Sequence, residues 1–185
     1  MEMPQLTDAH QRLRRLVGRF QGKENIYPSN WSPQAATASA SMDGRLITGG
    51  FAAVHDYEQK KNGKVSYSGH GVFRYDAPAG QYELHWFDSM GMGVNVFRGN
   101  FEGDKLVLTT HDANGYMRCI YDLGAKQGLG MRMETSQDGM NWQPFQSGDY
   151  LPARAPGQKP KAKKGPAKKA AARKSTKKKA RHKKR

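Results

Sequence analysis

Hydrophobic and polar residues alternate along most of the first 150 residues of the chain. Lys64–Tyr75 reads KVSYSGHGVFRY and Gln81–Asp88 reads QYELHWFD. In the second segment Tyr82, Leu84 and Trp86 share one face. Successive side chains of a strand point to opposite faces of a sheet. The alternation therefore predicts strands that bury one face.

Turn signals separate the alternating segments, and after the first long gaps they recur about every 11 to 13 residues. They are Asp43-Gly44, Asn62-Gly63, Pro78-Ala79-Gly80, Gly91, Glu102-Gly103-Asp104, Asn114-Gly115, Gly124 to Gly128 and Asp138-Gly139. Asn-Gly and Asp-Gly tolerate the positive φ of tight hairpins. We predict about ten strands, which include Gly18–Ile26, Ala35–Met42, Leu46–Tyr57, Lys105–Thr110, Tyr116–Leu123, Leu129–Thr135 and Trp142–Tyr150.

The order of these elements predicts an all-β fold. One short helix is expected, capped by Thr7 and reaching Arg15. No strand–helix–strand units follow it, which disfavours a parallel sheet. A long antiparallel meander protects its edges best by closing into a barrel. We expect a helix in residues 1–15, an antiparallel barrel in 16–153 and a basic tail in 154–185.

Charge separates the tail from the rest of the chain. Residues 1–155 contain 16 Lys+Arg and 16 Asp+Glu, whereas residues 156–185 contain 15 Lys+Arg and no acid. The tail also lacks aromatic residues and Leu, Ile or Val, so we expect it to be disordered on its own. A single cysteine, Cys119, excludes an intrachain disulfide, and no signal-peptide-like run opens the chain. We expect a cytoplasmic protein, with nucleoid association possible.

The tail is typical of segments that bind nucleic acid through phosphates. Its lysines and arginines would release counterions from the phosphate backbone without reading sequence. Anionic membrane surface, a nuclear address and solubility are alternative roles. The candidate residues are Lys161, Lys163, Lys164, Lys168, Lys169, Arg173, Lys174, Lys177, Lys178, Lys179, Arg181, Lys183, Lys184 and Arg185.

Three motifs carry a resemblance to a known family. LVGRFQG at residues 16–22 resembles the Leu-x-Gly-x-Trp-x-Gly opening of lipocalin-like (calycin) barrels, with Phe20 in place of the Trp. GVFRYD at 71–76 and YELHWFDSMG at 82–91 resemble the centre of the bacterial domain-of-unknown-function family numbered 1579. The resemblance runs from about Leu16 to Tyr150. It implies a calycin barrel and no particular reaction, and the tail resembles those of linker histones.

Large adaptable side chains suggest a pocket for a small apolar ligand. Arg118 and Arg132 could bind a ligand carboxylate if they point inward; ordinary core packing and solvated arginines are the alternative. The candidate ligand-binding residues are Trp86, Met90, Met92, Phe97, Arg118 and Arg132, and Tyr116, Met131 and Met133 could join them.

Catalytic and metal-binding patterns are weak. No pair of histidines has metal-site spacing and one cysteine cannot build a zinc site, so we expect no metal and no cofactor. Haem held by His70 or His85 is a minor alternative. Cys119 lies at an alternating strand position and reads as a buried, inert side chain.

Three hypotheses therefore remain. The first is a non-enzymatic barrel that binds a small apolar ligand and whose tail binds nucleic acid. The second is a nucleic-acid-associated protein whose barrel is a protein-interaction module. The third is an enzyme, which we rank last because no catalytic constellation is visible.

Overall fold

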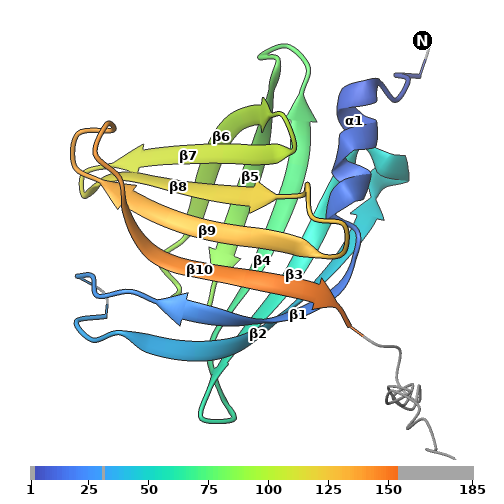
Figure 1. Cartoon of the computed structure of the whole chain (residues 1–185). Helices are drawn as coiled ribbons and strands as arrows, with labels where there is room; N and C mark the ends of the chain where they lie inside the picture. Colours follow the sequence, from blue (N-terminus) through green and yellow to red (C-terminus); the bar gives the residue numbers. More distant parts are fainter. Residues whose placement is uncertain (1–2, 31, 154–185) are drawn as a thin grey trace, which may run out of the picture. The chain divides into compact units, whose positions relative to one another are not determined.

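The computed structural model describes residues 3–30 and 32–153. In this part of the chain ten strands form one closed antiparallel barrel (Figure 1). They are β1 (Gly18–Ile26), β2 (Ala36–Ile47), β3 (Ala52–Lys61), β4 (Lys64–Asp76), β5 (Gln81–Asp88), β6 (Val94–Glu102), β7 (Lys105–Asp112), β8 (Gly115–Asp122), β9 (Leu129–Ser136) and β10 (Gln143–Pro152). The predicted all-β barrel is confirmed.

The first and last strands close the barrel. Each strand pairs with its neighbour in sequence, and β1 also pairs with β10. Phe20 of β1 accordingly lies opposite Met42 on one side and Pro152 on the other. Closure leaves no sheet edge with unpaired backbone groups, which is how a long meander avoids pairing with other chains.

A short helical segment covers one end of the barrel. α1 (Asp8–Arg12) continues into a 3₁₀ turn, η1 (Leu13–Leu16), so the expected helix is present but its last turn is tighter than an α-helix. The backbone N–H of Thr7 donates to His10 Nδ1 at 3.1 Å, which confirms Thr7 as the cap. No helix in the described part of the chain has both the length and the apolar character needed to cross a bilayer.

The predicted turn at Asp43-Gly44 is wrong. Both residues lie inside β2, and the chain turns later, at η2 (Thr48–Gly50), where Gly49 and Gly50 have φ of 68° and 103°. Gly44 serves close packing instead. A Cβ there would lie far inside contact distance of the Leu16 carbonyl oxygen and 2.8 Å from His55 Nε2.

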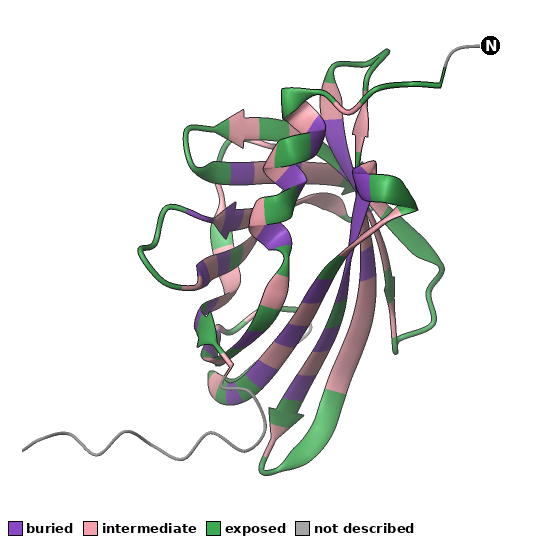
Figure 2. Ribbon diagram, turned by 90° about the vertical axis from the view of Figure 1, so that its right-hand side faces the viewer, coloured by how far each residue is buried: buried purple, intermediate pink, exposed green. Residues whose placement is uncertain are grey.

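Burial alternates along the strands as the pattern of the sequence requires. In β3, for example, His55 and Tyr57 are buried whereas Asp56 is exposed. Figure 2 shows this alternation as stripes along the strands. The hairpin between β3 and β4 turns through Asn62 and Gly63, whose φ values of 51° and 75° fit the predicted tight turn.

Candidate ligand-binding site

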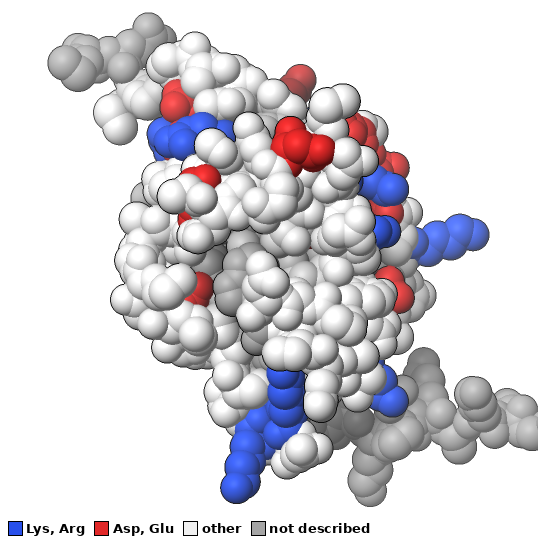
Figure 3. Space-filling view, turned by 90° about the vertical axis from the view of Figure 1, so that its left-hand side faces the viewer, with Lys and Arg blue, Asp and Glu red and all other residues white. Residues whose placement is uncertain are grey.

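The barrel has one closed end and one open end. At the closed end the α1–η1 segment lies across the strands, where Leu13 and Leu16 are fully buried and Tyr82 Oη donates to the Ala9 carbonyl at 2.9 Å. At the other end the β1–β2, β3–β4, β5–β6, β7–β8 and β9–β10 connections surround the mouth. The space-filling view onto this side shows a hollow between them (Figure 3).

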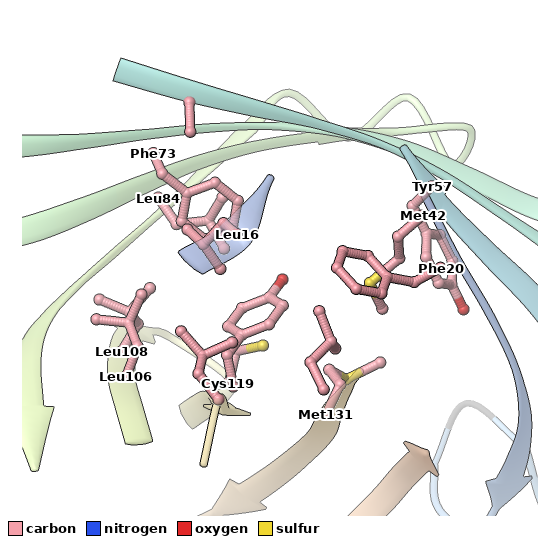
Figure 4. Packing of buried hydrophobic residues seen from close by; sticks show 14 of the residues in the cluster. Leu16, Phe20, Met42, Tyr57, Phe73, Leu84, Leu106, Leu108, Cys119 and Met131 are labelled. Atoms are coloured by element: carbon pink, nitrogen blue, oxygen red, sulfur yellow. The ribbon is translucent and has the colours of Figure 1, made fainter. Parts of the chain in front are cut away.

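Side chains near the closed end pack into a solid core. Leu16 lies beside Phe73 and Leu84, and Phe20 lies beside Met42 (Figure 4). The ring of His55 meets Phe73 edge-on at 5.0 Å between centroids, and its Nε2 is 2.7 Å from the Leu16 carbonyl oxygen. Burial lowers the pKa of His55, so the imidazole is neutral and Nε2–H donates to Leu16.

Side chains in the half nearer the mouth point inward but remain only half-buried. Trp86 follows the buried Leu84 on the inner face of β5, and Met117 and Met133 occupy the inner faces of β8 and β9. All three pack against the core cluster, yet they keep some exposure. Trp86 Nε1 donates to Tyr67 Oη at 2.9 Å. This half of the interior is therefore reachable from the mouth.

A buried carboxylate lies in the same half of the barrel. Glu24, on the inner face of β1, is 1% exposed. It accepts hydrogen bonds from the hydroxyl groups of Tyr57 and Tyr150 and from the amide nitrogens of Gln59 at 2.7 Å and Gln146 at 2.9 Å. Three strands, β1, β3 and β10, thus contribute to one polar cluster inside an otherwise apolar interior.

The two tyrosines of this cluster are held in the neutral form. Burial raises the pKa of Tyr57 and of Tyr150, and the Glu24 carboxylate beside them raises both further. Each therefore stays protonated around neutral pH and donates to Glu24. Gly148 of β10 leaves room for the carboxylate, because a Cβ there would lie 3.0 Å from Glu24 Cγ.

The structure separates the predicted ligand-binding residues into three groups. Trp86 and Phe97 face the interior, Trp86 half-buried and Phe97 2% exposed. Met131 and Met133 also face inward, while Tyr116 lies on the outer face and stacks with His111. Met90 and Met92 form the second group. They lie in the β5–β6 connection and are 66% and 81% exposed.

Arg118 and Arg132 form the third group, and they point away from the interior. Both pair with Glu134 on the outer face of β8 and β9, Arg132 through Nε at 2.6 Å. The Arg118 guanidinium also lies over the ring of Trp142, 4.1 Å from its centroid. These guanidinium groups contact Glu134 and Trp142 on the outer face and do not reach a ligand inside the barrel.

The histidines considered for haem also lie outside. His70 Nδ1 is 2.6 Å from Asp56 Oδ1, and His85 Nε2 is 3.0 Å from Glu83 Oε2. Among the described strand residues, His55 is the histidine that faces inward, at the closed end. Cys119 is 3% exposed, which confirms the prediction of a buried side chain, and burial raises the pKa of its thiol to about 12.

Two grooves lie on the outer face of the barrel. The larger, about 760 Å³, runs over β1 to β5, where Arg19 pairs with Asp43 and His70 with Asp56. The smaller, about 560 Å³, includes the Arg118–Glu134 pair. Several of their charged groups are already paired with one another. The predicted nucleic-acid-binding residues, from Lys161 to Arg185, lie outside the described residues.

Sequence reasoning missed Glu24. The signal was present, because in GRFQGKENI Glu24 is in phase with Phe20 and Ile26, the apolar residues of that strand. A charged residue on the buried phase of a strand requires partners inside the fold. Its partners come from β3, which follows β2 in the meander, and from β10, which only the closure of the barrel brings beside β1.

A family model described as "Protein of unknown function (DUF1579)" matches residues 5–151. The chain belongs to this family. The resemblance drawn from the central motifs is thereby confirmed, and the DUF1579 match also includes the N-terminal helix. No curated protein matches the chain.

Solved structures share the fold of this DUF1579 protein. Rv2717c from M. tuberculosis superposes with a TM-score of 0.60 at 18% identity, covering 81% of this chain and 100% of its own. The S-type phycobiliprotein lyase CPES from Guillardia theta has a TM-score of 0.55 at 10% identity, covering 82% of this chain and 99% of its own. At these identities the likeness concerns the fold alone.

Proposed function

We propose that the barrel binds a small, largely apolar ligand that enters through the open end. The observation that carries this proposal is the half-buried state of Trp86, Met117 and Met133, which face the interior near the mouth. Aromatic and methionine walls with a few polar groups are the usual lining of such sites.

Binding without turnover fits the described chemistry. The thiol of Cys119 is buried with a raised pKa, so it offers no nucleophile at neutral pH. The similar barrel of a protein named a phycobiliprotein lyase supports a role for this fold in handling small molecules, and at 10% identity no residue role is transferred from it.

Native mass spectrometry of the purified full chain, compared with its denatured mass, tests the proposal first. A reproducible extra mass is the expected result. If the ligand is lost in purification, the neutral fluorescent probe phenylnaphthylamine should bind, and Met133→Ala should weaken its binding whereas Met140→Ala, at a methionine 83% exposed, should not. An unchanged mass together with no binding of the probe would overturn the proposal.

The charge of the C-terminal segment favours a second activity, non-specific binding of nucleic acid. All of the net charge of +15 lies after residue 155. Contacts to about 6–10 phosphates would make affinity fall about 10³–10⁵-fold between about 50 and 200 mM salt. Fluorescence anisotropy on labelled duplex DNA should show this salt-dependent binding for the full chain. It should show almost no binding for residues 1–155. Equal binding by both chains would refute it.

A further inference from the structure

Three glutamates are buried in the described part of the chain, and they differ in how their charge is balanced. Glu83 and Glu134 are each 3% exposed and lie on the outer face. Arg74 and Arg98 pair with Glu83, and two further arginines pair with Glu134. The outer face thus neutralises each buried carboxylate with two guanidinium groups.

Glu24 is the most buried of the three, and its partners are neutral. Its hydrogen bonds come from two tyrosine hydroxyls and two amides. No lysine, arginine or histidine of residues 3–30 and 32–153 makes an ion pair with it. A buried charge is costly unless an opposite charge accompanies it. The interior of the barrel therefore lacks the positive charge that would match this carboxylate.

Two aromatic rings lie beside one of the side chains that donate to the carboxylate. Tyr57, which donates to Glu24, has the rings of Tyr67 and Trp86 at 6.0 Å between centroids, inclined to its own by 66° and 62°. The faces of such rings attract cations, most strongly where water is excluded. Rings and carboxylate together favour a positive group that also carries apolar surface.

Resting on the ligand-binding function proposed above, we propose that the ligand carries a cationic nitrogen, which lies against Glu24 while its apolar body covers Trp86. A metal ion fits the site less well. The groups around Glu24 donate hydrogen bonds rather than accept them. In the described residues no three His, Cys, Asp or Glu side chains gather into a metal site.

Gln146 is the group that an ammonium nitrogen would replace. It is only half-buried, and its Nε2 is shared between Glu24 Oε1 at 2.9 Å and Tyr57 Oη at 3.1 Å. It lies next to the irregularity in β10 between Pro144 and Gln146, where the pairing with β9 shifts. Rotation of this side chain would remove one of the donors to Glu24 Oε1 and leave the hydrogen bonds from Tyr57, Tyr150 and Gln59 to the carboxylate in place.

The test compares two probes with the same apolar chain, decylammonium and decyl alcohol, by isothermal titration calorimetry on the full chain at neutral pH and about 150 mM salt, where surface charges are screened within about 8 Å. Decylammonium should bind at least about tenfold more tightly, which corresponds to about 1.4 kcal/mol. The net charge of +15 opposes this preference, so it cannot arise from the overall charge.

Glu24→Gln should abolish the preference while leaving the affinity for decyl alcohol within about twofold. Glu134→Gln is the matched control, since it makes the same change on the outer face, and it should keep the preference. Circular dichroism shows whether each variant is folded, and if Glu24→Gln does not fold, the comparison of probes on the unmodified chain decides alone. Equal affinities for the two probes would overturn the cationic ligand and leave the binding function standing. Failure of both probes to bind would also overturn the cationic ligand, and the native mass and the phenylnaphthylamine measurement would then decide the binding function.

Discussion

Replacing Gly44 by alanine is the sharpest test of how the helical segment closes the barrel. Gly44 lies within β2, opposite His55 of β3. Its missing side chain lets the end of η1 approach, so that the Leu16 carbonyl accepts a hydrogen bond from His55 Nε2 at 2.7 Å. The added methyl group would have to push Leu16 and the His55 ring away.

The expected cost follows from these contacts. A Cβ at position 44 would lie 2.8 Å from His55 Nε2, so the ring must retreat by about half an ångström, and the Leu16 carbonyl by more. Overpacking of this kind costs about 1–3 kcal/mol. Loss of the buried His55–Leu16 hydrogen bond adds about 1–2 kcal/mol. We expect Gly44→Ala to lower the free energy of unfolding by about 2–5 kcal/mol, or Tm by about 4–20 °C.

Thermal unfolding followed by circular dichroism measures this cost. Ser39→Ala, at an exposed position of the same strand, is the control and should change Tm by less than about 2 °C. A Gly44→Ala protein that melts with the unmodified chain would show that η1 does not pack on β2 as described. The space beside position 44, which Leu16 and His55 occupy in the structure, would then be free for a methyl group.

Three further outcomes are expected. Trp86→Ala should lower the free energy of unfolding by about 3 kcal/mol. This value is at the lower end of the range for removal of a large aromatic side chain, because Trp86 is half-buried. A guanidinium titration that shows a loss of less than about 1 kcal/mol would contradict the packing of Trp86 against the core. Because burial lowers the pKa of His55 below 6.5, the unfolded chain binds more protons than the folded one below about that pH. Stability should therefore fall as the pH is lowered from about 7.5 to 5.5, and less steeply in His55→Gln; parallel slopes in urea titrations would refute this. A double-mutant cycle of Arg118→Ala and Glu134→Ala should give a coupling of about 1–3 kcal/mol, because Glu134 is buried, and a value near zero would show that the pair contributes nothing.

Local patterns were sufficient for the strands and most turns. Alternation and turn residues act over a few neighbours, so the Asn62-Gly63 turn and the common face of Tyr82, Leu84 and Trp86 could be predicted directly. The prediction of a turn at Asp43-Gly44 was wrong because the glycine there is set by distant residues rather than by its neighbours. Glycine is required at position 44 because Leu16 and His55, which are distant in sequence, pack against it. A rule based on neighbouring residues cannot distinguish a glycine required for packing from a glycine required for a turn.

The candidate site was only partly predictable. Arg118 and Arg132 look like anion-binding residues in isolation, but each lies one position away from an inward-facing residue and so faces outward. Glu24 could be placed on the buried phase of its strand, yet its partners Gln59 and Gln146 follow it by 35 and 122 positions. Such a cluster depends on barrel closure, which no local pattern encodes.

The pairing of β1 with β10 has a consequence for how the chain folds. The strand that completes the barrel is the last of the ten to be synthesised, and it must find residues that left the ribosome first. Contacts between such distant residues carry a large loop-closure entropy and slow folding, typically to milliseconds or seconds for β-rich domains. Until residues 143–152 join, β1 and β9 remain open edges that can pair with other chains. A chain that stops before β10 is therefore exposed to aggregation and proteolysis, and only a complete barrel escapes both.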